Sequence, residues 1–285
     1  MTSRPAAWPV ASTRLVALLG WPTEHSRSPA MHNAAFAHDG LDLIYLAIPT
    51  PVDRLGDVVG ALGAIGAVGA NVTIPHKQAV MASCDHVTDE AGLVGAVNTL
   101  TWDDGRLIGD NTDAAGLQRD LHEVLGAGRR ERAVVLGTGG AARAVAAAAA
   151  RMGWELVVVG RHLDRADEVA DVARSAGGAA TALQVDDDTV AVAVASADVV
   201  VNATPLGMHG ESLPGAFMTL TPDQVAYDLV YSPGRTPFLQ AAGSAGVAAH
   251  NGLGMLVQQA AAAYEIWTGR QAPVSVMQAA AAPTP

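Results

Sequence analysis

The chain reads Arg132-Ala133-Val134-Val135-Leu136-Gly137-Thr138-Gly139-Gly140-Ala141-Ala142, and this stretch decides its fold. The first five residues predict a short strand, and the alanine-rich segment after the glycines predicts a helix. Between them, Gly137 permits a tight turn, Gly139 lets the backbone approach a pyrophosphate, and Ala142 allows close packing of helix on strand. The free N–H groups at the start of the helix favour an anion. The stretch therefore predicts a dinucleotide-binding loop.

The residues after the next predicted strand indicate which dinucleotide is bound. An NAD enzyme places an acid about 20 residues beyond the glycine loop, against the ribose 2′-hydroxyl. Here the chain has Arg161 and Arg165, with His162 and Asp164 between them. Guanidinium groups match a phosphate rather than a neutral hydroxyl. This favours NADP, although Asp164 leaves the use of NAD open.

The surrounding sequence predicts two alternating α/β units. Residues 14–72 alternate as strand, helix, strand, helix, strand, and a hairpin is expected over residues 96–109. Residues 115–228 form a second alternating unit around the glycine loop, and residues 254–268 predict a long apolar helix. Short connections between alternating elements are typical of parallel α/β domains.

Composition excludes several classes of function. The net charge of −11 argues against nucleic acid and anionic membrane surfaces as partners, because both attract clustered Lys and Arg. The single cysteine, Cys84, forms no internal disulfide, and no Cys/His spacing indicates zinc. No apolar segment reaches the length of a membrane span, and residues 1–12 look like a short tail rather than a signal peptide. We therefore expect a cytoplasmic, soluble, metal-independent protein.

The chain holds a single lysine, Lys77, beside sixteen arginines. Arginine stays protonated in proteins, whereas lysine can serve as an acid or base. Short-chain dehydrogenases place Tyr four residues before Lys, downstream of the glycine loop, but Lys77 lies upstream and follows Thr73. Zinc alcohol dehydrogenases need cysteine ligands that the chain lacks. Lys77 is therefore the leading candidate for proton transfer in a dehydrogenase.

From about Leu15 to Gly269 the chain resembles the shikimate dehydrogenase family. The motifs, in family order, are residues 20–33 (GWPTEHSRSPAMHN), 71–77 (NVTIPHK), 95–99 (GAVNT), 109–113 (GDNTD), the glycine loop, 202–208 (NATPLGM), 228–233 (DLVYSP) and 254–260 (GMLVQQA). One departure lies at residues 160–162, where Gly160-Arg161-His162 replaces the usual Asn-Arg-Thr. The ordered set is far more specific than any one motif.

The resemblance implies an α/β fold with a substrate-binding domain, residues 1–113 with 250–285, and a Rossmann-like NADP-binding domain, residues 114–249, with a cleft between them. It implies NADPH-dependent reduction of 3-dehydroshikimate to shikimate in aromatic amino acid biosynthesis, the chorismate pathway. Lys77 and Asp113 are then the catalytic pair, and Thr204 and Gly254 join the glycine loop, Arg161 and Arg165 at the cofactor. The implied substrate contacts are Ser26, Ser28, Thr73, Asn98, Tyr231 and Gln259.

Several alternatives stay open at this point. Quinate or an amino analogue of shikimate differs by one substituent, and the predicted hydroxyl contacts do not choose among them. A non-catalytic NADP-binding regulator could use the same scaffold. The Lys77/Asp113 pair could also be a structural salt bridge, and a homodimer is left open as the assembly.

Overall fold

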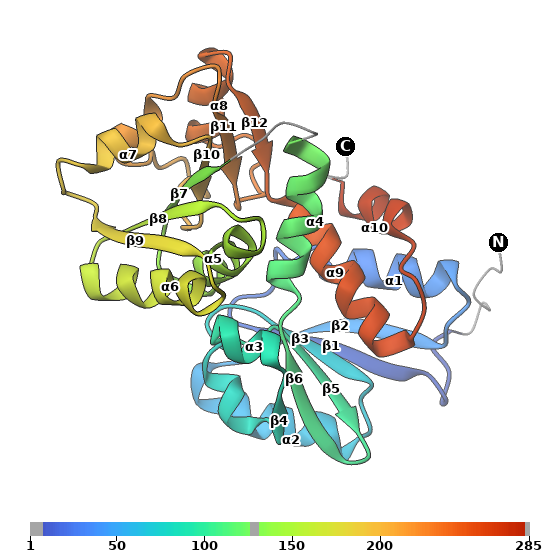
Figure 1. Ribbon diagram of the computed structural model, residues 1–285. Helices are drawn as coiled ribbons and strands as arrows, with labels where there is room; N and C mark the ends of the chain where they lie inside the picture. Colours follow the sequence, from blue (N-terminus) through green and yellow to red (C-terminus); the bar gives the residue numbers. More distant parts are fainter. Residues whose placement is uncertain (1–7, 126–130, 283–285) are drawn as a thin grey trace. The chain divides into compact units, whose positions relative to one another are not determined.

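The computed structural model describes residues 8–125 and 131–282, so the predicted tail lies partly outside the described residues. The chain forms two compact units, one made of residues 1–112 with 257–285 and the other of residues 113–256 (Figure 1). The chain passes from one unit to the other twice, at the start of helix α4 (Asp113–Leu125) and within helix α9 (Leu253–Thr268). Within the described residues, no helix is long and apolar enough to cross a membrane.

The first unit is built on a six-stranded sheet in the order β2-β1-β3-β5-β6-β4. Strands β1, β2 and β3 are parallel, whereas β5 runs antiparallel to both β3 and β6, which confirms the predicted hairpin. The strands are β1 Arg14–Gly20, β2 Leu43–Pro49, β3 Gly69–Val72, β4 His86–Val87, β5 Thr99–Asp103 and β6 Arg106–Asp110. The helices are α1 Ser28–His38, α2 Leu55–Ala64, α3 Asp89–Val94, α9 Leu253–Thr268 and α10 Val274–Ala281, with short 3-10 turns η1 Val52–Arg54 and η2 Ala79–Ser83.

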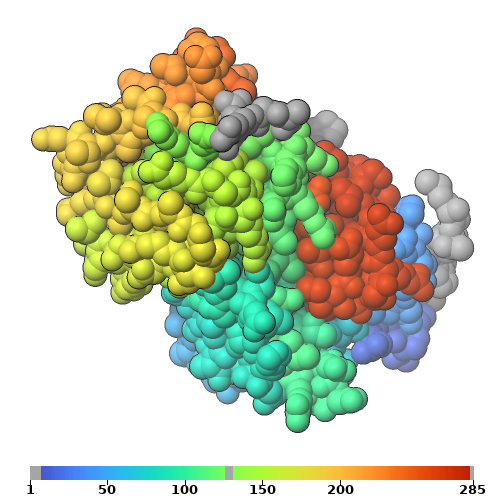
Figure 2. Space-filling view, in the orientation of Figure 1, coloured from blue at the N-terminus to red at the C-terminus, as the bar shows by residue number. Residues whose placement is uncertain are grey.

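Residues from both ends of the chain complete the first core. Helix α2 packs on one face of the sheet, while α1, α9 and α10 cover the other. Helix α10 lies along α1, and Figure 2 shows their surfaces adjoining. On α9, Trp267 donates from Nε1 to the Leu100 carbonyl at 3.0 Å. Gly69 has no side chain to obstruct that indole, since a Cβ there would stand 2.2 Å from Trp267 Nε1.

His32 is a titratable group inside this core. Its ring is fully buried, stacks on Tyr45 with centroids 4.5 Å apart, and lies 5.3 Å from the Trp267 ring. Among the described residues, neither ring nitrogen has a hydrogen-bond partner of good geometry. Burial lowers the pKa of His32 to about 3, and the nearby Asn71 amide offsets this only in part.

We expect His32 to make the protein less stable in acid. The unfolded state binds a proton at His32 below about pH 6.5, whereas the folded state does so only near pH 3, so stability falls as pH drops through that window. At pH 5 the loss is about 2 kcal/mol. Urea unfolding of the native protein and of His32→Leu at pH 7.5 and pH 5 measures it. An equal loss between the two pH values in both proteins would contradict this role.

The second unit contains a parallel sheet in the order β12-β11-β10-β7-β8-β9. Counted along the chain, this is the 3-2-1-4-5-6 order of the Rossmann fold, read from β9 to β12. Its strands are β7 Arg132–Leu136, β8 Glu155–Gly160, β9 Ala179–Gln184, β10 Val199–Asn202, β11 Val225–Asp228 and β12 Ala248–Asn251. Its helices are α4 Asp113–Leu125, α5 Gly140–Arg151, α6 Leu163–Ser175, α7 Val190–Ser196 and α8 Pro237–Ser244, with the 3-10 turn η3 Gly215–Met218.

Small residues set the spacing between the layers of this second unit. Six of the eight alanines of α5 are buried, and their small side chains let the helix lie close to the sheet. One face of the sheet packs on a cluster that includes Phe217, Phe238 and Leu239. The strand and helix predicted around the glycine loop are both present. Five elements of the fold, β4, η3, α8, β12 and α10, were not predicted from the sequence.

Candidate active site

The glycine loop of the second unit has the geometry that its sequence predicts. Gly137 follows β7 with φ +128°, and its N–H donates to the Val159 carbonyl at 2.9 Å. A Cβ on Gly137 would stand 2.8 Å from the carbonyl oxygen of Ala203, the residue after β10. The loops after β7 and β10 therefore touch at the point where the strand order reverses, which is where Rossmann folds bind their ligands.

The N-terminus of α5 is exposed next to this point. Gly139 caps the helix, is exposed, and would have no atom within 4 Å of an added Cβ. Gly160 leaves room for Thr138, because a Cβ at position 160 would come within 2.5 Å of the Thr138 methyl group. Gly140 and Ala141 form the first turn, and the buried Ala142 packs on the sheet. These free N–H groups and the open approach fit a pyrophosphate.

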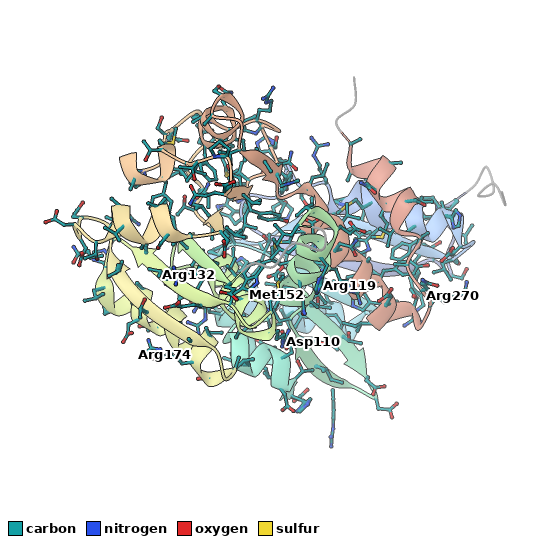
Figure 3. The ribbon with its side chains drawn as sticks, turned by 45° about the horizontal axis from the view of Figure 1, so that its top comes forward. Asp110, Arg119, Arg132, Met152, Arg174 and Arg270 are labelled. Atoms are coloured by element: carbon teal, nitrogen blue, oxygen red, sulfur yellow. The ribbon has the colours of Figure 1, made fainter. Side chains whose placement is uncertain are left out.

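Arg161 follows β8 directly and stays exposed. Among the described residues it makes no hydrogen bond and no ion pair. Two other exposed arginines of this unit are paired: Arg165 with Glu168 at 3.3 Å, and Arg174 with Asp167 at 2.5 Å. Figure 3 labels Arg174 on the outer surface of α6. A guanidinium without a partner beside a phosphate-binding loop is suited to receive an added phosphate.

The loop after β10, residues 203–208, is shaped by the Asn202 side chain and is called here the cofactor loop. Asn202 Oδ1 accepts from the Thr204 N–H at 3.0 Å and from the Thr204 hydroxyl at 2.6 Å. Its Nδ2 donates to the Leu206 carbonyl at 3.0 Å and to Asp228 Oδ1 at 2.9 Å. The predicted contact Thr204 is thus fixed from the end of a buried strand.

Gly254 stands where α9 begins, against α4. A Cβ there would lie 1.9 Å from Asp120 Oδ1, so only glycine permits this approach. The buried Asp120 also accepts a hydrogen bond from the Tyr227 hydroxyl. Burial raises the pKa of the Asp120 carboxyl, and the Tyr227 hydrogen bond counteracts the rise.

In the first unit, two predicted substrate segments meet beyond the carboxyl ends of β1 and β3. The Trp21 N–H donates to the Ile74 carbonyl at 3.0 Å, and a Cβ on Gly20 would stand 2.3 Å from the Thr73 methyl group. The loop that carries Ser26 and the loop that carries Thr73 therefore lie side by side.

Ser28 and its neighbours form a hydrogen-bonded set. The Ser28 N–H donates to Ser26 Oγ at 3.2 Å, and the Ser28 side chain hydrogen-bonds to the Tyr45 hydroxyl. Tyr45 in turn donates to Asn71 Oδ1 at 2.8 Å. Burial raises the pKa of Tyr45, so its hydroxyl stays protonated and keeps this donor role.

Lys77 lies on a loop that is anchored on both sides. The His76 ring hydrogen-bonds through Nε2 to the Thr50 carbonyl at 2.7 Å. The Lys77 carbonyl accepts from the Val97 N–H at 2.7 Å, which ties the loop to the segment of Asn98. The Lys77 side chain is half-buried.

Asn98 is buried, and much of its amide is already engaged. Its Oδ1 accepts from the Thr112 N–H at 2.8 Å and from the Thr99 hydroxyl at 2.8 Å, and its Nδ2 donates to Thr112 Oγ1 at 3.0 Å.

Gln259 is buried in α9. Asp113 is the first residue of the second unit, so its pairing with Lys77 stays a prediction, as does the role of the half-buried Tyr231.

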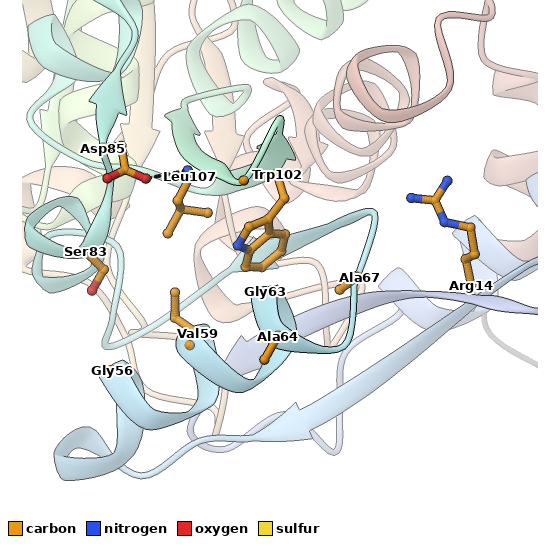
Figure 4. Close-up of a pocket in the computed structure, with 13 residues that line it drawn as sticks. Arg14, Gly56, Val59, Gly63, Ala64, Ala67, Ser83, Asp85, Trp102 and Leu107 are labelled. Atoms are coloured by element: carbon orange, nitrogen blue, oxygen red, sulfur yellow. Dashed lines mark hydrogen bonds between the residues drawn. The ribbon is translucent and has the colours of Figure 1, made fainter.

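The first unit also contains a cavity of about 500 Å³ that none of the predicted site residues lines. It lies between α2 and the β5–β6 hairpin, with the Trp102 indole over Gly63 (Figure 4). A Cβ on Gly63 would stand 2.7 Å from Trp102 Nε1. The cavity is therefore bordered by a face of α2 that carries small residues.

Four anchoring residues had no role in the sequence interpretation: Asn71, His76, Asn202 and Asp228. All four stand inside the quoted motifs, so the signal was present. These residues hold loops in place rather than binding ligands, and only their hydrogen bonds in the structure reveal that role.

Comparison with known proteins matches these motifs to one family. Residues 18–100 match the family model of the shikimate dehydrogenase substrate binding domain, and residues 252–282 match that of the shikimate 5'-dehydrogenase C-terminal domain. The NADP(+)-dependent shikimate dehydrogenase of Methanopyrus kandleri is 44% identical over 95% of this chain and 95% of its own. The chain belongs to the shikimate dehydrogenase family.

Solved structures of family members share the fold. The shikimate dehydrogenase of Thermus thermophilus, in complex with NADP(H) and shikimate, superposes with a TM-score of 0.84 at 37% identity, covering 94% of this chain and 98% of that one. A quinate dehydrogenase from Corynebacterium glutamicum, in complex with NAD, gives 0.87 at 34% identity, with 94% and 98% covered.

Proposed function

We propose that this protein is an NADP-dependent shikimate dehydrogenase, an oxidoreductase that reversibly reduces 3-dehydroshikimate to shikimate in aromatic amino acid biosynthesis. The observation that carries the proposal is full-length similarity to curated NADP(+)-dependent shikimate dehydrogenases. The open glycine loop and the unpaired Arg161 fit the cofactor. The cytoplasmic location and a homodimer stay predictions from the sequence.

In this proposal the protein binds NADPH with the loop after β7, and the cofactor supplies the hydride. The free N–H groups at the start of α5 hold the pyrophosphate. Arg161 and Arg165 receive the 2′-phosphate, and Arg165 must exchange its exposed Glu168 partner for it. The cofactor loop with Thr204, and Gly254 at the start of α9, line the nicotinamide end.

The substrate is held by hydroxyl and amide groups. Ser26 and Ser28 hold the carboxylate, with Thr73 and Tyr231 nearby, and the Ser28 hydroxyl turns from Tyr45 to reach it. Lys77, Asn98, Asp113 and Gln259 bind the ring hydroxyls. The set selects hydroxylated rings, because an analogue without a hydroxyl leaves buried polar groups unpaired.

Lys77 carries the proton chemistry. As negative charge develops on the substrate oxygen, the protonated amine stabilises it and donates the proton; in the reverse direction the amine accepts it. Asp113 orients the amine and the substrate hydroxyl. In the competing interpretation the pair is only a salt bridge.

NADPH absorbance separates the candidate functions. We expect oxidation of NADPH with 3-dehydroshikimate, and none without substrate. Activity with quinate and NAD instead would favour the quinate alternative, for which the similar quinate dehydrogenase structure is the specific observation. An amino analogue of shikimate is tested in the same way. NADPH binding without turnover of any of these would indicate a regulator.

Arg161→Ala should raise the KM for NADPH by about 10–100-fold, because a charge-assisted hydrogen bond to phosphate is lost. The KM for NADH, which lacks the 2′-phosphate, should not change. Arg174→Ala is the matched control, since Arg174 is exposed on α6 and paired with acidic neighbours. An unchanged KM for NADPH in Arg161→Ala would refute the assignment of this arginine.

A further inference from the structure

One buried carboxylate joins two loops at the carboxyl edge of the second sheet. Asp228 ends β11 and is 0% exposed. Its Oδ1 accepts from Asn202 Nδ2 at 2.9 Å and from the Val230 N–H at 3.0 Å, and its Oδ2 accepts from the Thr236 hydroxyl at 2.5 Å. A carboxylate so deeply buried is retained only when its oxygens are satisfied.

One set of hydrogen bonds connects Asp228 to the cofactor loop through Asn202. Asn202 is itself 0% exposed, and it uses both ends of its amide on Thr204 and Leu206. Asp228 fixes which way that amide faces, because its carboxylate accepts only from the NH₂ end. The conformation of the cofactor loop therefore depends on a charge that lies outside it.

A second set of hydrogen bonds connects Asp228 to residues 229–236, called here the substrate loop because it carries Tyr231. The Val230 N–H and the Thr236 hydroxyl bind the two oxygens of Asp228 near the two ends of this loop. Thr236 also caps α8, since its Oγ1 accepts from the Leu239 N–H at 3.3 Å. Both ends of the loop are thereby fixed to β11.

The two loops also touch each other directly. Gly207 of the cofactor loop has φ +100°, and a Cβ there would stand 3.0 Å from Thr236 Cβ. The Leu229 N–H donates to the Asn202 carbonyl at 2.9 Å. Movement of either loop must disturb the other at Asp228.

We infer that Asp228 is a positioning residue that fixes the cofactor loop and the substrate loop to each other, so that one buried carboxylate sets both binding sites of this unit. The inference rests on the proposed function, which assigns Thr204 to the cofactor and Tyr231 to the substrate. Asp228 touches neither ligand in this scheme. Its effect passes through Asn202 and Thr236.

The test compares Asp228 with Gln224, another buried polar anchor at the opposite end of the same strand. Gln224 donates to the Val194 and Ala197 carbonyls at 2.7 and 2.8 Å, away from both loops. We expect Asp228→Ala to raise the NADPH Kd and the KM for 3-dehydroshikimate each by about tenfold or more. Gln224→Ala should lower the Tm but leave both constants within about twofold of the native protein.

Asp228→Asn is the conservative variant. Its amide oxygen can still accept from Asn202 and Val230, and its NH₂ can donate to Thr236 Oγ1. We expect both constants to return to within about threefold of the native protein. Asp228→Ala with a lowered Tm and unchanged constants would overturn the inference.

Two further measurements keep the test decisive. If Asp228→Ala does not fold, Thr236→Val removes the Oδ2 partner together with the cap of α8. We expect it to raise the substrate KM more than the NADPH Kd; unchanged constants overturn the inference. NADPH Kd is read by fluorescence titration without turnover. A native protein that binds NADPH but does not turn over 3-dehydroshikimate refutes the proposed function. In that case the NADPH Kd values of the Asp228 variants still test whether Asp228 positions the cofactor loop.

Discussion

Lys77→Ala should lower kcat for 3-dehydroshikimate reduction by about 10²–10⁴-fold, the range expected when a general acid is removed. The NADPH Kd should stay near its native value, because Lys77 lies in the first unit and the glycine loop in the second. Steady-state kinetics and fluorescence titration of NADPH measure the two quantities. The anchors of the loop, the His76 ring and the Lys77 carbonyl, are untouched by the change.

Lys77→Met provides the control for packing, since it keeps an unbranched stem without the amine. We expect it to lose as much kcat as Lys77→Ala while retaining the native Tm. Unchanged turnover in both variants would leave Lys77 as a structural residue and remove the acid–base role. Asp113→Asn tests the partner: a smaller loss than for Lys77 fits an orienting carboxylate.

Gly137→Ala should destabilise the second unit and abolish tight binding of NADPH. At φ +128° an alanine is strained, and its Cβ would press on the Ala203 carbonyl oxygen at 2.8 Å. Backbone strain costs about 1–3 kcal/mol and overpacking costs a similar amount. The loop can relieve the clash only by moving away from the cofactor loop. Urea unfolding and NADPH titration measure the two effects.

Gly139→Ala separates stability from cofactor binding. Its backbone is unstrained, and an added Cβ meets no protein atom within 4 Å. We expect a small loss of stability, about 1 kcal/mol for a poorer helix cap. The added methyl group stands where the backbone must approach a pyrophosphate, so the NADPH Kd should rise. Native affinity in Gly139→Ala would show that the phosphates bind elsewhere.

Local patterns account for most of the fold. The strand Arg132–Leu136 has the predicted bounds, and the alternating strands and helices predicted for residues 14–72 are present, because apolar periodicity is a local signal. The missed strand Ala248–Asn251 has no β-branched residue, and its conformation depends on pairing with β11. The missed helix Val274–Ala281 gains its place by packing on α1, which no local pattern reveals.

The residues of the candidate site also fall into two groups, those that could be predicted from the sequence and those that could not. Ligand-facing groups such as Lys77 and Gly137 could be proposed from residue type and motif. The anchors could not, because a buried Asn202 or Asp228 gives no chemical signal until its hydrogen-bond partners are known. The side chains that meet the ligand can therefore be predicted from the sequence more readily than the buried side chains that hold their loops in place.

The first unit takes its residues from both ends of the chain, and this has a consequence for biosynthesis. A ribosome releases residues 1–112 long before residues 257–285, whereas the second unit is one uninterrupted segment. Until Trp267 emerges, His32 and Tyr45 lack the indole that packs on them. We expect the second unit to fold first, and the first unit to be completed only once residues 257–285 have emerged from the ribosome.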